Sequence, residues 1–348
     1  MKKIMSVALC LAMVLSIALL SAGCGSSQPT ISVYNWGEYI DMDVLKQFEE
    51  ETGIKVKYDT FGSNEEMYTK IKSGGGKYDV LIPSDYMIER LIQNDMLHEL
   101  NYDNIPNAQY IMEKFRDSDF DPGNKHSIPY MWGTVGILYN KTMVNGEIDS
   151  WNALFDEQYA KQILMYDSAR DSLMVGLRQN GYDINSRDEQ ELADATQTLI
   201  NQKPLVLAYV MDEVKDKMIQ GEAALALVYS GYVIDAIEEN SDLAYCLPKE
   251  GSNVWMDSMV IPSTSQNPEL AEKFIDFMCR PDIALKNIEY VAYSTPNQGT
   301  YDLFDDSMKN NPVAYPSDEE LARCTFFHDL GDYNEKYDEA WLKVKTSN

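Results

Sequence analysis

From Thr30 onward the sequence alternates short strand patterns with amphipathic helix patterns, and this order limits the possible folds more than any other feature of the chain. The strand patterns are short apolar or alternating runs, and the helix patterns space apolar side chains three and four residues apart. In the first part of the chain we expect strands at 31–34, 54–58 and 79–83, and helices at 43–52, 64–73 and 86–93. Such an order is typical of an open α/β layer.

The second part of the chain repeats this order, which predicts a second α/β lobe. Strands are expected at 137–140, 163–166 and 223–229, an apolar segment at 259–262, and helices at 151–155, 188–200, 232–239 and 269–278 and after Pro281. Two lobes joined by more than one crossing of the chain place a ligand cleft between them. We therefore expect lobe 1 to comprise residues 30–135 and 260–305, and lobe 2 to comprise residues 136–259 and 306–348.

The first 29 residues are predicted to be an export signal and a tether. Two lysines precede an apolar stretch that ends in Leu20-Ser21-Ala22-Gly23-Cys24. This layout resembles a bacterial lipobox, so residues 1–24 are expected to be a lipoprotein signal peptide and 25–29 a short tether. An ordinary cleaved signal peptide and a retained membrane helix stay open as alternatives. Because no later stretch is long and apolar enough to span a bilayer, we expect an extracytoplasmic body anchored to the cell membrane through Cys24, or a periplasmic one if the host has an outer membrane.

The composition narrows the class of partner. The chain carries 29 Lys and Arg against 56 Asp and Glu, a formal net charge of −27. Such a surface is a poor partner for nucleic acid and for anionic lipid headgroups, and it attracts cationic ligands.

The cysteines and histidines indicate no metal, cofactor or catalytic centre. Once the signal is removed and Cys24 is lipidated, three cysteines remain, Cys246, Cys279 and Cys324, and their spacing matches neither a disulfide scaffold nor a zinc motif. A single disulfide among them stays open. We expect no enzymatic activity, because a glycoside hydrolase would need a pair of positioned carboxylates that nothing in the sequence singles out.

Two short motifs each set an indole beside a carboxylate. Trp36 precedes Glu38 by two residues, and Trp255 precedes Asp257 by two residues, each time where the chain is expected to leave a strand. An aromatic face and an ionised oxygen together suit an ammonium group, through a cation–π contact and a charge-assisted hydrogen bond. The alternative is that both tryptophans are core residues and both acids are helix caps.

Polar and aromatic residues follow several of the expected strands. They form four motifs, Trp36–Tyr39, Ser84–Tyr86, Asp167–Asp171 and Tyr229–Gly231. In open α/β sheets, ligands bind outside the carboxyl ends of the strands. The sequence therefore predicts that these four motifs line one ligand cleft.

At these residues the chain resembles the spermidine/putrescine-binding proteins of bacterial ABC importers, from about Ile31 to the C-terminus. The most specific pieces are Tyr34–Tyr39, Glu51–Val56, Tyr78–Ser84, Ser127–Gly133, Pro248–Gly251, Trp255–Ser258 and Tyr293–Asn297. The resemblance implies a type II periplasmic-binding-protein fold of two lobes, which closes on a polyamine and delivers it to an ABC permease. We also expect a monomer.

The resemblance assigns roles to individual residues. It implies an aromatic box of Trp36, Tyr39, Tyr86, Tyr229, Trp255 and Tyr293, acidic contacts from Glu38, Asp171 and Asp257, and a cleft hydroxyl from Ser84. Each nitrogen of a polyamine then meets an acid or a hydroxyl, and its methylenes meet apolar walls. A sugar-binding lipoprotein and a ferric-ion binder remain the alternative functions.

The chain departs from the family pattern at two positions. Ser168 stands where spermidine binders often carry a second aspartate, and Phe327 replaces a polar glutamine. These departures leave open the number of amines in the ligand. Asp167 is expected to face away from Ser168, because neighbouring strand residues point to opposite faces. Arg170 is expected to be structural, since its charge would repel a cationic ligand. Three further tryptophans, Trp132, Trp151 and Trp341, are expected to pack in the body of the protein.

Overall fold

The computed structural model describes residues 28–347, so the predicted signal peptide and Cys24 lie outside the described part of the chain. Two separate hydrophobic cores organise these residues. We call the part built around the first core the first lobe and the part built around the second core the second lobe. Among the described residues, no helix combines the length and apolar character needed to cross a membrane.

One nine-stranded sheet runs through both lobes, in the order β2-β1-β3-β9-β4-β7-β5-β6, with β8 paired to β4. The strands are β1 (Thr30–Trp36), β2 (Lys55–Phe61), β3 (Val80–Leu81), β4 (Ser127–Asn140), β5 (Ile163–Tyr166), β6 (Val206–Val210), β7 (Leu225–Tyr229), β8 (Leu243–Cys246) and β9 (Val254–Val260). The pairs β1–β2, β1–β3, β5–β6 and β5–β7 are parallel. The pairs that involve β4 or β9 are antiparallel.

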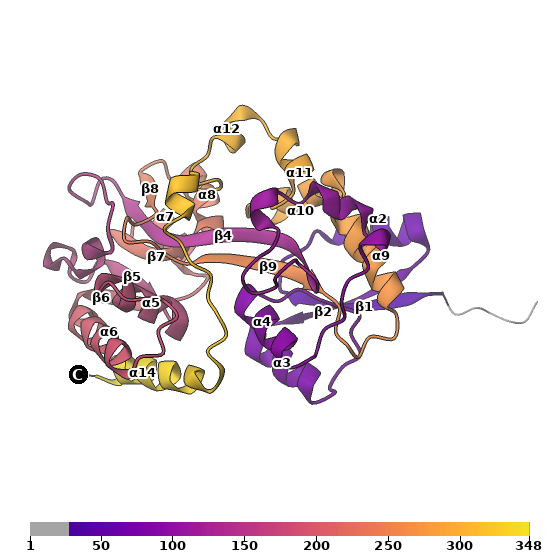
Figure 1. Ribbon diagram of the computed structural model, residues 1–348. Helices are drawn as coiled ribbons and strands as arrows, with labels where there is room; N and C mark the ends of the chain where they lie inside the picture. The colour runs from indigo at the N-terminus through magenta and orange to yellow at the C-terminus, as the bar shows by residue number, and fades with distance from the viewer. Residues whose placement is uncertain (1–27, 348) are drawn as a thin grey trace, which may run out of the picture.

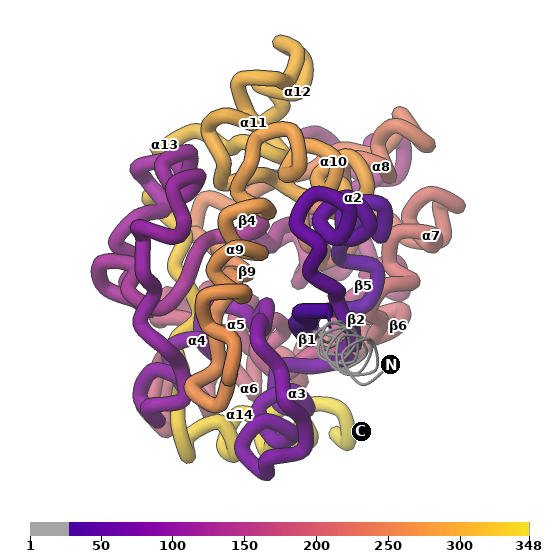
Figure 2. The backbone as a smooth tube through the Cα atoms, turned by 90° about the vertical axis from the view of Figure 1, so that its right-hand side faces the viewer, coloured from indigo at the N-terminus to yellow at the C-terminus, as the bar shows by residue number. Residues whose placement is uncertain are grey.

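The first lobe packs helices around β1, β2, β3 and β9. These helices are α2 (Met42–Thr52), α3 (Asn64–Lys72), α4 (Asp85–Gln93), α9 (Pro268–Met278), α10 (Pro281–Val291) and α11 (Gln298–Leu303). Helix α2 shows why the local sequence folds this way. Asp41 caps its first turn, Val44, Leu45 and Phe48 are buried on one face, and Gly53 ends it with a φ of 72°. Figure 2 views this lobe from its outer side, with α2, α3, α4 and α9 around the strands.

The second lobe is built around the second core. Its helices are α5 (Ala169–Gln179), α6 (Glu189–Gln202), α7 (Val214–Ile219), α8 (Ser230–Glu239) and α14 (Asn334–Thr346). Shorter helices complete the described chain, α12 (Asp306–Lys309), α13 (Asp318–Leu321), and the 3-10 turns Tyr102–Asn104, Pro106–Tyr110, Glu113–Phe115, Trp151–Phe155, Glu157–Tyr159, Lys203–Leu205 and Gly331–Tyr333.

Strands β4 and β9 connect the lobes and run side by side between them (Figure 1). The first half of β4 pairs with β9, from Ser127 opposite Val260 to Thr134 opposite Val254. Its second half pairs with β7 in the other lobe. Accordingly, Trp132 belongs to the first core, whereas Val135 belongs to the second.

The C-terminal segment makes a further connection. After α12 and α13 it returns between the lobes, and α14 then packs in the second lobe (Figure 1). Phe327, Leu330 and Trp341 are buried in the second core. The chain therefore passes between the lobes at three places, and their relative position depends on all three.

The structure corrects several local predictions. Trp255 and Asp257 lie inside β9 and not after a strand, because the strand begins at Val254, earlier than the apolar run at 259–262 suggested. The strand expected at 79–83 is only Val80–Leu81, and residues 151–155 form a 3-10 turn. Strands β6 and β8 and helix α5 were not predicted, because the two strands are short and the buried residues of α5 follow one another from 171 to 177 and do not mark a single face.

Candidate functional site

A buried carboxylate on β9, that of Asp257, lies at the edge of the first lobe. It is 6% exposed. Its Oδ1 accepts a hydrogen bond from Ser84 Oγ at 2.6 Å, and its Oδ2 accepts one from the Tyr39 hydroxyl at 2.7 Å. Burial raises the pKa of this carboxyl to about 6, and the two hydrogen bonds act in the opposite direction. The carboxylate therefore remains ionised at neutral pH although its charge is poorly solvated.

The two donors reach Asp257 because of where their own elements end. Ser84 is the N-cap residue of α4 and forms an isolated antiparallel bridge with Asp257. Tyr39 follows β1 in the loop before α2, and the hydroxyl of Tyr130 donates to its carbonyl at 2.8 Å. Hydroxyls from two loop segments thus converge on one strand residue.

A second buried carboxylate, that of Asp171, lies in the first turn of α5 in the second lobe. It is 5% exposed. Its Oδ2 accepts from Ser168 Oγ at 2.5 Å and from the Tyr229 hydroxyl at 2.9 Å. Burial raises its pKa, while the two hydroxyls and the charge of Arg170 oppose this shift. Asp171 therefore repeats the Asp257 arrangement, with one serine and one tyrosine on a buried acid.

A row of aromatic rings connects the two carboxylates. The ring centroids of Tyr39 and Tyr293 are 5.6 Å apart, and those of Tyr293 and Trp255 are 5.1 Å apart. Trp255 is followed by Tyr229 at 6.3 Å. We call Tyr39, Tyr293, Trp255 and Tyr229 the aromatic row. The last three are half-buried, so the row offers ring surface between two buried negative charges.

This arrangement suits a cation with an apolar body. In the described part of the chain, neither Asp257 nor Asp171 has a lysine, arginine or histidine nitrogen within salt-bridge distance. A buried anion without a cationic partner is costly, so a ligand ammonium group is stabilised there. Methylene groups between two ammonium groups pack well against aromatic faces.

The structure also brings in an acid that the sequence analysis missed, Asp85. Its side chain is 1% exposed and accepts from the backbone N–H of Met256 at 3.0 Å and of Tyr86 at 2.7 Å. Burial is the main cause that raises its pKa to about 8, and the charge of Asp257 adds to the rise. Through these two hydrogen bonds Asp85 links the first turn of α4 to β9 beside Asp257. An acid at the first helical position is a common pattern, so nothing in the sequence indicates this contact.

Three predicted site residues lie outside the row and its carboxylates. Trp36 packs on Phe61, with a centroid distance of 4.6 Å, and Glu38 is exposed with a φ of 51°. The Tyr86 hydroxyl donates to Glu65 at 3.0 Å and accepts from Asn64 at 3.1 Å, so it faces α3. The structure therefore unites Tyr39, Ser84, Asp171, Tyr229, Trp255, Asp257 and Tyr293, and leaves these three at its margin.

The remaining residues of the Asp167–Asp171 motif take separate roles. Asp167 accepts from Lys345 at 2.6 Å and from Trp341 Nε1 at 3.2 Å, so it faces α14, as expected from the alternation. Arg170 donates to the His328 carbonyl and to Asn185, and its guanidinium lies 4.4 Å from the centre of the Phe327 ring. The structural role expected for Arg170 is confirmed.

The other tryptophans and the cysteines behave as structural residues. Trp132 and Trp151 are buried and donate to the carbonyls of Thr295 and Gly251, which confirms the prediction that they pack in the body. The three described cysteines, Cys246, Cys279 and Cys324, are free. Within residues 28–347, no group of three or more His, Cys, Asp or Glu side chains is placed to hold a metal ion.

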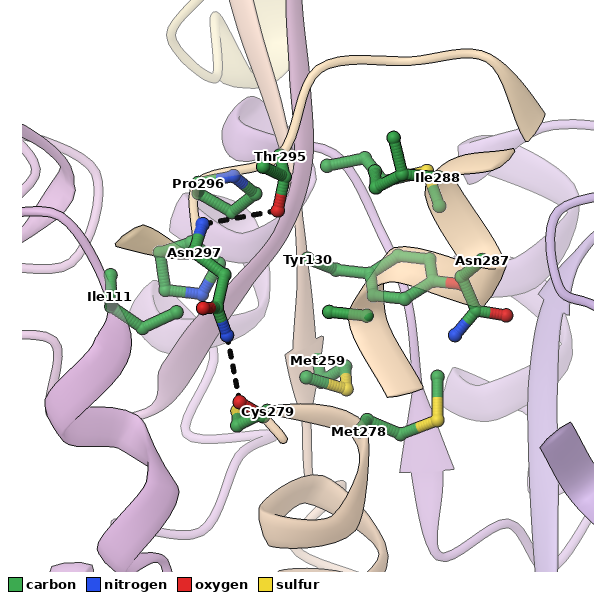
Figure 3. A pocket seen from close by; sticks show the side chains of 13 residues that line it. Ile111, Tyr130, Met259, Met278, Cys279, Asn287, Ile288, Thr295, Pro296 and Asn297 are labelled. Carbon is green, nitrogen blue, oxygen red and sulfur yellow. Dashed lines mark hydrogen bonds between the residues drawn. The ribbon is translucent and has the colours of Figure 1, made fainter. Parts of the chain in front are cut away.

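Neither of two hollows in the first lobe coincides with the aromatic row. The cavity drawn in Figure 3 lies among Tyr130, Met259 and Met278 and has a volume of about 10 Å³, which is room for one water molecule. An open hollow of about 390 Å³ lies beside Tyr102 and Arg116. None of the predicted site residues lines either hollow.

The chain matches a known protein family and is similar to a relative of known function. Residues 43–316 match the model of the family described as bacterial extracellular solute-binding protein. The spermidine/putrescine-binding periplasmic protein of Salmonella typhimurium is 34% identical over 328 residues, which cover 94% of each chain.

Two solved structures are similar over nearly the whole described body. The substrate-binding protein of a spermidine/putrescine ABC transporter from Streptococcus pneumoniae is 43% identical, with a TM-score of 0.83, over 92% of this chain and 99% of its own. A putative spermidine/putrescine ABC transporter protein from Listeria monocytogenes is 42% identical, with a TM-score of 0.86, over 92% and 100%. The likeness and the two cores confirm the expected two-lobed α/β fold.

Proposed function

Since the chain belongs to the bacterial extracellular solute-binding proteins, and within them to the spermidine/putrescine-binding group, we propose that it binds a polyamine outside the cytoplasm and delivers it to the permease of an ABC importer. The relatives are named as binding proteins and transporter components, and we expect binding without chemical turnover here.

One observation carries the proposal, namely that a row of aromatic rings joins two buried carboxylates with no cationic side chain of the described residues within salt-bridge distance. Spermidine and putrescine carry ammonium groups separated by methylenes. A hydrogen bond from an ammonium to a carboxylate contributes about 1.5–3 kcal/mol. Each cation–π contact adds roughly 0.5–2 kcal/mol. A sugar has no charge to offset the burial of Asp257 and Asp171.

The hydroxyl pairs explain how the site remains stable without its ligand. Ser84 and Tyr39 satisfy the oxygens of Asp257, and Ser168 and Tyr229 satisfy one oxygen of Asp171. A carboxylate oxygen has more than one acceptor position, so an ammonium can be added without loss of these bonds. When the lobes close and water is excluded, each ion pair is strengthened.

The proposed ligand contacts are those expected from the sequence, in two groups. The inner group is Tyr39, Ser84, Asp171, Tyr229, Trp255, Asp257 and Tyr293, and the outer group is Trp36, Glu38 and Tyr86. The hydrogen bonds and ring distances support the inner group directly. The outer group would contact only a longer ligand or one still entering the site.

We also propose a monomer anchored to the cell membrane through Cys24, with lobe 1 at 30–135 and 260–305 and lobe 2 at 136–259 and 306–348. The membership of the two cores supports these bounds outside two segments, β9 and residues 315–326, of which Tyr315, Leu321 and Phe326 pack against the first core. Val254, Met256 and Met259 of β9 pack in the first core, whereas Trp255 packs against the second.

The test is a calorimetric and thermal-shift panel with the mature protein and putrescine, spermidine, spermine, a set of sugars and ferric ion. We expect binding of at least one polyamine and recovery of the ligand unchanged. Binding of a sugar or of iron, with no response to any polyamine, would overturn the proposal.

A further inference from the structure

The ring of Tyr293, the central member of the aromatic row, packs directly against the backbone of Gly231 in the opposite lobe. A Cβ atom on Gly231 would lie 1.5 Å from Tyr293 Cε1 and 1.6 Å from Cδ1. Such distances are far below any real non-bonded contact, so no side chain fits at position 231 while the ring keeps this place. Only glycine permits the observed contact.

The first lobe holds Tyr293 firmly. Ala292 ends α10 with a φ of 63°, and the next residue but one, Ser294, forms a bridge with Trp132 on β4. Trp132 Nε1 also donates to the Thr295 carbonyl at 3.1 Å. Tyr293 itself packs against the first core. Its backbone therefore moves with the first lobe.

Gly231 moves with the second lobe. It lies in the first turn of α8, whose Val233 and Ala236 are buried in the second core. The neighbouring Tyr232 donates from its hydroxyl to Asp212 at 2.9 Å within the same lobe, and its ring centroid lies 6.3 Å from that of Tyr293. The contact of Tyr293 with Gly231 consequently joins one lobe to the other at the centre of the site.

We propose that the Tyr293 ring packs against the backbone of Gly231 when the lobes close, and that this contact determines how closely the two lobes approach each other around the ligand. The inference rests on the proposed polyamine site and adds a positioning residue to it. With a side chain at 231, either the ring must move toward Trp255 and Tyr39 or the lobes must stay apart. In both cases the row no longer spans the distance between Asp257 and Asp171.

Other close-packed glycines do not join the lobes in this way. A Cβ on Gly176 would meet the carbonyl of Ala195 at 2.8 Å, and both residues belong to the second lobe. A Cβ on Gly133 would meet the Trp255 ring at 2.6 Å and Ser230 Oγ at 2.7 Å, but Gly133 lies on β4, the strand that itself connects the lobes, and is paired with Trp255 on β9. Gly62 offers a matched control outside the site, because a Cβ there meets only the end of the Glu66 side chain, at 3.3 Å.

The experiment compares Gly231→Ala with Gly62→Ala and the wild-type protein. For Gly231→Ala we expect at least a tenfold loss of affinity for the polyamine that the wild type binds, and a smaller ligand-induced compaction in small-angle X-ray scattering. The melting temperature of the ligand-free variant should be unchanged or higher, since alanine favours a helix more than glycine does. Gly62→Ala should bind as the wild type does.

A double-mutant cycle with Tyr293→Ala isolates the contact. Tyr293→Ala weakens binding by itself, but Gly231→Ala should cost little in that background because no ring remains to be displaced. Two independent, additive losses would overturn the inference. So would wild-type affinity of Gly231→Ala, or a ligand-free variant that melts well below the wild type. If the wild type binds no polyamine at all, the proposed function itself fails.

Discussion

The two buried carboxylates of the site accept hydrogen bonds from the same types of side chain, but their electrostatic surroundings differ. Asp257 and Asp171 each accept from one serine and one tyrosine hydroxyl. Asp257, however, lies on a strand, and only those two hydroxyls favour its charged form. Asp171 lies at the start of α5, where the helix dipole favours an anion, and the charge of Arg170 favours it as well.

This difference shows that two carboxylates with the same hydrogen-bond donors can differ in how strongly they bind an ammonium group. The charge of Asp171 is already partly compensated by its own lobe, so a ligand cation adds less there. The charge of Asp257 is compensated only by neutral groups. We therefore expect Asp257 to be the stronger anchor for an ammonium group, and the following experiments can break or sharpen this comparison.

The largest effect is expected for Asp257→Asn. Loss of the acid leaves a buried ammonium without its partner, a cost of about 3 kcal/mol, or roughly a hundredfold in affinity by calorimetry. The ligand-free variant should melt higher than the wild type at pH 7, because a poorly solvated charge is removed. Asp43→Asn, at an exposed acid paired with Lys46, is the control and should bind normally.

Asp171→Asn should weaken binding less, by about tenfold, or about 1.4 kcal/mol. The smaller loss follows from the helix N-terminus and Arg170, which already share the charge of this acid. An equal or larger loss than that of Asp257→Asn, measured under the same conditions, would reverse the order of the two anchors.

The affinity should fall as the pH is lowered from 7 to 5, by about tenfold for each unit below the pKa of Asp257 near 6, since protonation removes the charge that the ligand needs. Stability changes in the opposite sense. The pKa of this carboxyl is raised on folding, so the ligand-free fold gains stability as the pH drops from above 6 toward 4. Calorimetry from pH 5 to 8 should show the loss in the wild type, and a much flatter profile in Asp257→Asn.

Tyr39→Phe and Tyr229→Phe each remove one donor from one acid. Each should cost about 1 kcal/mol, roughly fivefold in affinity. Tyr39→Phe should also raise the pH at which binding is half lost, because the charged form of Asp257 loses one of its two hydrogen bonds. If Tyr229→Phe moved that pH equally, the two acids would not be independent.

The smallest effect is expected for Ser168→Asp, which keeps an N-cap acceptor for α5 and adds an acid beside Asp171. The ratio of spermidine to putrescine affinity should rise by roughly threefold, as is typical for a partly exposed ion pair. An unchanged ratio in competition calorimetry would show that Ser168 does not select the ligand.

Much of the site could be predicted from residue type and position. Ser84 and Asp171 follow predicted strands at helix starts and Tyr229 ends one, where ligands of α/β sheets bind, and the structure groups all three at the two buried carboxylates. Trp36 and Glu38 met the same criterion and lie at the margin, because the chain turns at Glu38 with a positive φ. The direction of a side chain after a strand depends on the turn, which the pattern does not reveal.

The sequence by itself determined the alternation of strands and helices, the acidic charge, and the acids and aromatic residues available to a cationic ligand. Each of these depends on residue type or on near neighbours along the chain. Only the tertiary structure decided the partners. Tyr39 and Ser84 meet Asp257 across 218 and 173 residues, and Tyr293 rests on Gly231 of the other lobe. Such contacts follow from strand register and from the packing of two cores, and these depend on the whole chain at once.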